Sequence, residues 1–140
     1  MAGEERIAAG GGSIRDDELC FLGRGEELEL YLALRAELLS RWPNTELRPR
    51  STQTGFAERY IYAVASPGTR RIKGAPEHYV LLSVVLPEPS GSARVAVIAE
   101  ASPHRFTHHI VIGSSEDMDG EAMGLAALSH AFALERGGGR

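Results

Sequence analysis

The fold is decided by residues 100–112, which read Glu-Ala-Ser-Pro-His-Arg-Phe-Thr-His-His-Ile-Val-Ile. Ser102 and Pro103 signal a turn, because proline fixes its own φ and keeps the preceding residue out of the helical region. The β-branched residues that follow favour an extended chain, so we expect a strand from Phe106 to Ile112 that ends at Gly113. Three histidines, an arginine and a glutamate make this stretch the first place to look for a functional site.

The adjacent histidines are expected on opposite faces of the sheet, because side chains alternate along a strand. His108 shares the more apolar face with Phe106 and Ile110, which predicts a buried imidazole whose two ring nitrogens are both hydrogen-bonded. His109 shares the other face with Arg105. It is therefore the candidate for a solvent-facing or ligand-facing group whose charge can change near neutral pH.

Four further runs with a period of two precede this strand. They are Thr45 to Arg50, Phe56 to Val64, Tyr79 to Leu86 and Arg94 to Ala101. Groups of serine, proline and glycine mark turns between them, and no helix-length segment separates them. Parallel neighbours need long crossovers, so the sequence predicts an antiparallel five-strand meander.

Two helices are predicted, one before the strands and one after them. Residues Glu26 to Trp42 repeat apolar side chains at helical spacing, and Pro43 ends the segment. A final helix is expected to start after Ser114 or Ser115, whose hydroxyls can cap its free amides. With helices only at the two ends, both can cover one sheet face and leave the other partly open for binding or dimerisation. The predicted fold class is α+β.

Length and composition fit one domain with one core, since the chain has 140 residues of which 43% are hydrophobic. We expect a flexible leader over residues 1–17, because this glycine-rich segment has too little apolar surface to offset its ordering entropy. The single α+β domain is expected over residues 18–136, followed by a disordered tail over residues 137–140.

Charge and cysteine content limit the partners and the compartment. The net charge of −4 gives no basic footprint, which disfavours nucleic acid as a partner. The single cysteine, Cys20, excludes an intramolecular disulfide and fits a reducing, cytoplasmic compartment. There is no cationic start followed by an apolar run, and Tyr79 to Leu86 is too short to span a bilayer. We therefore expect no secretion signal and no membrane partner.

Seven polar residues are candidates for ligand binding: Gln53, Arg59, Lys73, Glu100, Arg105, His108 and His109. Gln53 and Arg59 are expected on one strand face, where they can meet a common ligand, although a row of solvated side chains gives the same pattern. Arg59 or Arg105 beside Glu100 would clamp an anion or form an ordinary surface ion pair. Glu100 with either adjacent histidine would provide a general acid and base if the side chains lie within hydrogen-bond reach.

The sequence predicts neither a metal nor a cofactor. Adjacent strand histidines diverge, and no helical pair of histidines four residues apart is present. Gly10-Gly11-Gly12 is not a phosphate loop, because no strand precedes it and no Lys-Ser or Lys-Thr follows it. Catalytic residues stay unassigned, since nucleophile, base and charge stabiliser do not appear together.

Several of these residues also resemble those of a known family. Residues 100–109 carry the pattern Glu-x-x-Pro-x-Arg-x-x-His-His, and Thr52-Gln53 followed by Phe56 carries Thr-Gln-x-x-Phe. From about Phe21 to Leu134 the chain resembles the bacterial domain of unknown function family 5655. The resemblance implies an α+β domain without an established activity. It also implies an accessory role around nucleic acid, because similar domains occur joined to nuclease-like domains. The family's lysine before the Thr-Gln pair is Ser51 here, and its tryptophan in the last helix is missing.

Three functions follow from these patterns. The first hypothesis is a small cytoplasmic module that binds an unknown small molecule or protein. The second is a small enzyme that uses His108 or His109 with Glu100 as acid and base. The third is a self-associating domain, such as a homodimer, which an apolar open sheet face would favour.

Overall fold

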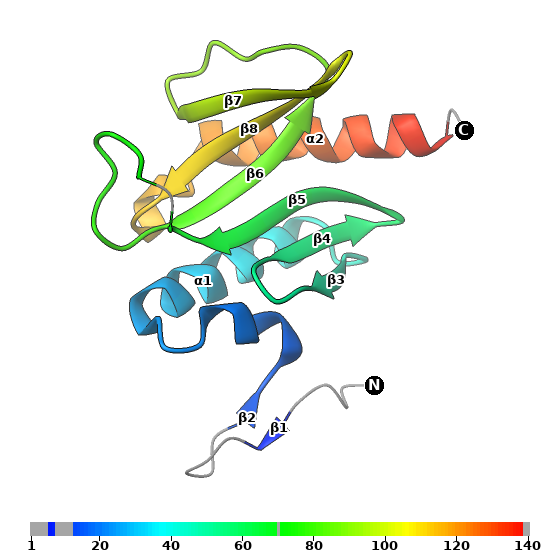
Figure 1. Ribbon diagram of the computed structural model, residues 1–140. Coiled ribbons are helices and arrows are strands. Elements are labelled where there is room, and N and C mark those ends of the chain that lie inside the picture. The colour runs from blue at the N-terminus through cyan, green and yellow to red at the C-terminus, as the bar shows by residue number, and fades with distance from the viewer. Residues whose placement is uncertain (1–5, 8–12, 70, 139–140) are drawn as a thin grey trace.

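The computed structural model describes residues 6–7, 13–69 and 71–138, with side chains described for residues 15–69 and 71–135. Its elements are, in order, β1 (Arg6–Ile7), β2 (Ser13–Ile14), the 3₁₀ helix η2 (Asp16–Phe21), α1 (Gly25–Arg41), β3 (Glu46–Pro49), β4 (Thr54–Glu58), β5 (Tyr60–Pro67), β6 (Val80–Leu86), β7 (Val95–Ser102), β8 (Arg105–Ile112), the 3₁₀ helix η3 (Ser115–Asp117) and α2 (Gly120–Gly138). Helices and antiparallel strands occupy separate parts of the chain, which confirms the α+β class (Figure 1).

The main sheet of the described chain has six antiparallel strands in the order β3-β4-β5-β6-β8-β7. The predicted count of five is wrong because residues 56–64, expected as one strand, contain a sharp turn. β4 ends at Glu58 and β5 begins at Tyr60, and Arg59 between them has a φ of 81°. Neither Glu58 nor Arg59 is a usual turn former, so the alternating pattern runs through the turn without a break.

The strand order also differs from the predicted meander, because β8 lies between β6 and the edge strand β7. Residues 87–94 therefore cross β8 on their way from β6 to β7. They cross on the face that carries His108, since the backbone N–H of Ser90 donates to His108 Nε2 over 2.9 Å. We call residues 87–94 the crossing segment.

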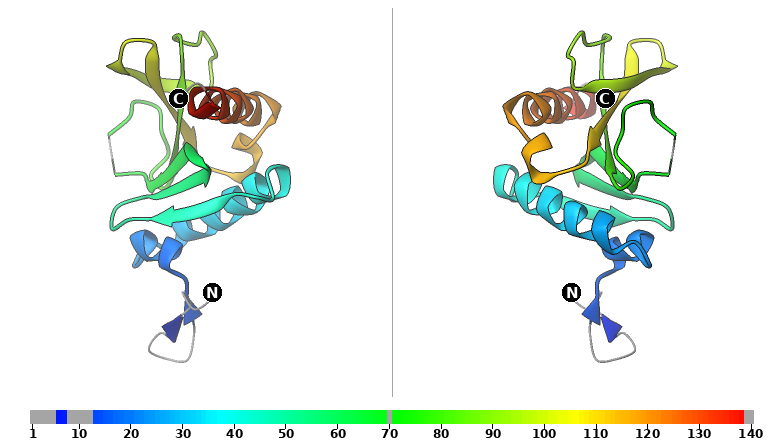
Figure 2. Two further views of the ribbon diagram at one scale, coloured as in Figure 1. Left: turned by 90° about the vertical axis from the view of Figure 1, so that its right-hand side faces the viewer. Right: turned by 90° about the vertical axis from the view of Figure 1, so that its left-hand side faces the viewer.

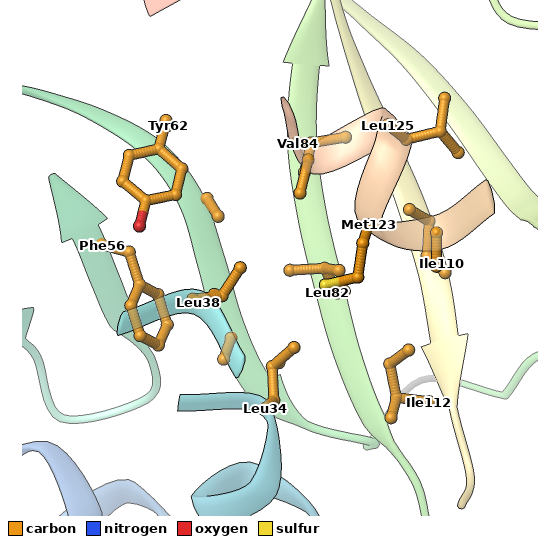
Figure 3. Packing of buried hydrophobic residues seen from close by; sticks show 14 of the residues in the cluster. Leu34, Leu38, Phe56, Tyr62, Leu82, Val84, Ile110, Ile112, Met123 and Leu125 are labelled. Atoms are coloured by element: carbon orange, nitrogen blue, oxygen red, sulfur yellow. The ribbon is translucent and has the colours of Figure 1, made fainter. Parts of the chain in front are cut away.

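α1 and α2 pack against the same face of the sheet, as the side views show (Figure 2). In the core between the layers, Leu34 and Leu38 of α1 and Met123 of α2 approach Leu82 of β6 and Ile110 of β8 (Figure 3). All five side chains are fully buried. Burying one side chain of this size contributes roughly 1.5–3 kcal/mol, so this layer holds both helices on the sheet.

The helix boundaries differ from the prediction mainly at their starts. η2 includes Asp17, which was expected in the flexible leader but is buried. α2 begins at Gly120 and not near Ser114, because the Asp119 carboxylate accepts the N–H of Ala122 over 2.8 Å and so caps the helix. α2 extends to Gly138, past the start of the predicted tail.

The predictions for the two chain ends fall partly outside the described residues. Of the predicted leader, β1 and β2 pair with each other, whereas residues 1–5 and 8–12 are not described. Of the predicted tail, residues 139–140 are not described. Within the described ranges, no helix combines the length and the apolar character needed to cross a membrane.

Candidate functional site

The sheet face turned away from α1 and α2 is the candidate functional surface, and we call it the open face. Residues that pair directly across antiparallel strands point to the same side. One row of such partners runs Val64, Ser83, His109 and Val97, across β5, β6, β8 and β7. The neighbouring rows are Val85, Thr107 and Ala99 on one side and Ser66, Leu81 and Val111 on the other. These rows contain no carboxylate, lysine or arginine.

Ser83 and His109 form the polar centre of the open face. The Ser83 hydroxyl and His109 Nδ1 lie 2.7 Å apart, and both residues are half-buried. Val64 and Val97 flank this pair in its row. The hydrogen bond satisfies a polar group on each residue, so the pair can lie within an apolar surface at little desolvation cost.

The connection between β5 and β6 borders the open face at one end. Figure 2 shows this connection standing out on the side of the sheet opposite the helices. It contributes Ile72 and Lys73 to a pocket of about 370 Å³ that also includes Val111 of the open face and Arg94. Lys73, one of the predicted ligand-binding residues, is therefore at the border of the open face and exposed.

The remaining predicted site residues do not converge. Gln53 precedes β4 and Arg59 follows it, so a five-residue strand, roughly 17 Å long, separates them. Gln53 lies in the turn before β4 and not on a strand face shared with Arg59, which corrects that expectation. Glu100 and Arg105 belong to the β7–β8 hairpin, at the other side of the sheet. Arg105 shares the open face with Thr107 and His109, as the strand alternation predicts. One small ligand therefore cannot contact the Gln53 and Arg59 side of the sheet and the Glu100 and Arg105 side at once.

Glu100 also faces away from His109. Glu100 pairs with Phe106, whereas His109 is three residues further along β8 and points to the open face. The acid and base pair suggested by their closeness in sequence is thus not assembled. Among the ion pairs of the described side chains, none joins Glu100 to Arg59 or Arg105. Arg59 instead lies over the ring of Tyr60, 5.8 Å from its centroid.

His108 is fully buried, as the strand alternation predicts. Its Nε2 accepts the N–H of Ser90 over 2.9 Å, and its Nδ1 lies 2.8 Å from the carbonyl oxygen of Phe106. A carbonyl can only accept, so the ring is the neutral tautomer with its proton on Nδ1. Nδ1 fixes the ring against its own strand and Nε2 holds the crossing segment, which makes His108 a positioning residue.

Three polar clusters outside the sheet were not predicted from the sequence. In the first, Asp17 of η2 receives hydrogen bonds from the Tyr31 hydroxyl over 2.5 Å and from Arg35 over 2.7 Å. Arg35 also binds Glu18 over 3.0 Å. Burial, together with the Asp17 carboxylate, raises the pKa of the Tyr31 hydroxyl well above its usual value of 10. This cluster fixes η2 on α1.

The second and third clusters each contain a histidine. His78 lies between the carboxylates of Glu27 and Glu26 at the start of α1. His130 of α2 stacks on Trp42, with ring centroids 4.7 Å apart, and its Nε2 lies 2.9 Å from Glu58 at the end of β4. Each histidine joins elements that are distant in sequence, so no local sequence pattern predicts either contact.

The described side chains offer no group of three or more histidine, cysteine, aspartate or glutamate residues arranged to hold a metal ion. Comparisons with protein-family models, with curated proteins and with solved structures each found no match to this chain. The resemblance to family 5655 therefore stays a prediction. The functional argument rests on the geometry of the chain itself.

Proposed function

We propose that this chain is a cytoplasmic partner-binding module whose open face associates with a second copy of the chain. The observation that carries the proposal is the composition of the three paired rows on that face. Valine, alanine, serine, threonine, leucine and histidine occupy all ten positions. A cytoplasmic location is part of the proposal and is supported by the single, unpaired Cys20.

Ten adjoining positions without a charged side chain are unusual for a surface that meets only water. Charged side chains make up 24% of the chain, yet the three rows contain none. Eight of the ten positions are half-buried, Ala99 is exposed and Leu81 is buried, so the rows offer a partner the outer part of their side chains. Burying the apolar part of that area contributes roughly 25 cal/mol per Å². The position of the face supports partner binding, because α1 and α2 both lie on the other side of the sheet.

Charge supports a second copy as the partner. A two-fold symmetric interface brings the same patch of two chains together, so a charged patch would meet its own charge. The chain has a net charge of −4, and contact through most of its surface would therefore cost electrostatic energy. The three rows avoid that cost, although Arg105 lies beyond Thr107 on the same face of β8.

Light scattering coupled to size-exclusion chromatography tests this proposal over a range of protein concentrations. A dimer has about 30 kDa, twice the 15.1 kDa of one chain. Val97 lies on the open face and Ile98, which is exposed, on the opposite face of the same strand, so they provide a matched pair. We expect Val97→Glu to shift the protein to monomer and Ile98→Glu to leave association unchanged. A wild-type monomer at all concentrations up to about 1 mM contradicts the proposal.

A second candidate function is hydrolysis, and the Ser83–His109 hydrogen bond is the observation that favours it. An imidazole at 2.7 Å can accept the hydroxyl proton as a serine oxygen attacks an acyl group. A fluorophosphonate probe followed by intact mass measurement tests this candidate. Hydrolytic function requires one adduct that Ser83→Ala abolishes and that His109→Gln slows. Absence of an adduct rejects this candidate and leaves the association proposal unaffected.

A further inference from the structure

An apolar groove lies between the second half of α2 and the segment that follows β6. It has a volume of about 550 Å³, within the usual range for ligand pockets. Leu86, Leu128 and Phe132 supply apolar lining, and Pro87 and Pro89 belong to the opposite wall. Leu128 is 59% exposed, which is unusual for a leucine with no partner over it. The groove is separate from the open face, because it belongs to the helix-bearing side of the sheet.

The proline-containing wall is held in place before any ligand arrives. Pro87 and Pro89 fix φ at two positions of the wall, which removes much of the conformational freedom of this segment. Next to them, the N–H of Ser90 is bound to the buried ring of His108. Two residues further on, the Ser92 hydroxyl is hydrogen-bonded to Glu121 of α2. A wall restrained in this way loses little entropy on binding, so the groove is preorganised.

The groove is acidic as well as apolar. Glu88 and Glu135 both line it and both are exposed, and its described lining includes no lysine, arginine or histidine. A ligand that fits must therefore place an apolar group over Leu128 and Phe132 and a positive charge near the two carboxylates. A second copy of this acidic chain would bring further negative charge overall, which makes it a poorer occupant.

We propose that this groove binds a segment of a partner protein in which a large apolar side chain is flanked by lysine or arginine. The apolar side chain occupies the groove as the anchor residue. The flanking cations pair with Glu88 and Glu135 at the rim. His108 contributes as a positioning residue by holding the wall. This site is a second binding surface, independent of association through the open face.

Nuclear magnetic resonance of the full, ¹⁵N-labelled chain tests the proposal with a short synthetic peptide. The probe is N-acetyl-Lys-Phe-Lys-amide, and the matched control is N-acetyl-Glu-Phe-Glu-amide. We expect saturable shifts of the amides of residues 86–90 and 128–135 with the basic peptide. The acidic peptide should bind about tenfold more weakly, since both of its charges meet glutamate.

Three variants make the test specific. Leu128→Asp removes the exposed apolar lining and should abolish the shifts, whereas Leu134→Asp, an exposed leucine of α2 outside the groove, should leave binding unchanged. The double substitution Glu88→Lys with Glu135→Lys should reverse the preference in favour of the acidic peptide. The amide spectrum itself reports whether each variant is folded.

Several outcomes overturn the proposal. Equal affinity for the two peptides, no saturable shift, or shifts that map to the open face would each do so. Shifts of groove residues that depend on protein concentration without any peptide would identify a second copy as the occupant. That result would also refute a basic partner segment.

Discussion

His78 Nδ1 and the carboxylate of Glu27 lie 2.9 Å apart, which ties the segment before β6 to the first turn of α1. His78 Nε2 lies 3.0 Å from Glu26. Carboxylates only accept and a neutral imidazole has one N–H, so only the imidazolium can donate to both. The hydrogen bond with Glu27, followed by the nearby negative charges, raises the pKa of His78 above 6.5. Burial alone would raise the pKa of Glu27, but the bond with His78 helps to bring it below 4.5.

The first prediction is a pH-dependent stability that this pair controls. Its stabilisation is fully present between pH 4.5 and 6.5, the ordinary pKa values of the two groups. It is lost as pH rises through the raised pKa of His78, or falls through the lowered pKa of Glu27. We expect His78→Gln to lower the urea midpoint clearly at pH 5.5 and much less at pH 9. His104→Gln, at an exposed turn, is the control and should have the same effect at both pH values. Equal effects of His78→Gln at the two pH values would contradict this assignment.

The second prediction concerns the contrast between the two adjacent histidines of β8. His108→Leu removes the acceptor for the N–H of Ser90 and leaves that partly buried N–H beside an apolar side chain. We expect it to lower the free energy of unfolding by about 2–3 kcal/mol and to accelerate amide hydrogen exchange at Ser90. His109→Leu removes the hydrogen bond to Ser83 between two half-buried side chains and should cost about 1 kcal/mol, the usual net contribution of a neutral hydrogen bond. Urea unfolding of both variants measures the difference. Comparable losses would show that the crossing segment does not depend on His108.

Local sequence patterns predict most of the helices and strands. The apolar repeat from Glu26 to Trp42 predicts α1 to within a residue at each end, and β-branched runs predict the strands around Leu82 and Ile110. Strand alternation also assigns His108 to the interior. The turn at Arg59 could not be predicted, because it lacks glycine, proline and asparagine.

Contacts between distant segments explain why most of the candidate site was missed. Ser83 meets His109 because β6 pairs with β8 in one particular register, and 26 residues separate the two in sequence. The same holds for Glu27 and His78, which are 51 residues apart. Strand order and register depend on loop path and packing, which a period of two does not encode. Glu100 and His109 illustrate the converse, since they are close in sequence but point to opposite faces.

The third prediction tests the buried cluster that anchors η2. The Tyr31 hydroxyl is the closer of the two donors to Asp17, and the carboxylate is almost completely buried. We expect Tyr31→Phe to lower the free energy of unfolding by about 1.5–3 kcal/mol, the usual contribution of a hydrogen bond to a charged group. Tyr60→Phe keeps the ring beneath Arg59 and should change it by less than about 0.5 kcal/mol. A small effect at Tyr31 in urea unfolding would mean that the ion pairs with Arg35 and Arg15 compensate the Asp17 charge without the hydroxyl.

The fourth prediction concerns the turn at Arg59, which the sequence pattern does not predict. Arg59 has a φ of 81°, a region that costs a residue with a Cβ roughly 1–2 kcal/mol and costs glycine nothing. Arg59→Gly should therefore stabilise the fold by up to about 1 kcal/mol, after the greater chain entropy of glycine in the unfolded state is subtracted. Arg50, exposed in the turn between β3 and β4, has no such φ, so Arg50→Gly should destabilise by about 0.5–1 kcal/mol. The same substitution is thus expected to have opposite signs at two exposed arginines in thermal or urea unfolding. Destabilisation by both would show that the Arg59 side chain, through its contact with Tyr60, outweighs the backbone strain.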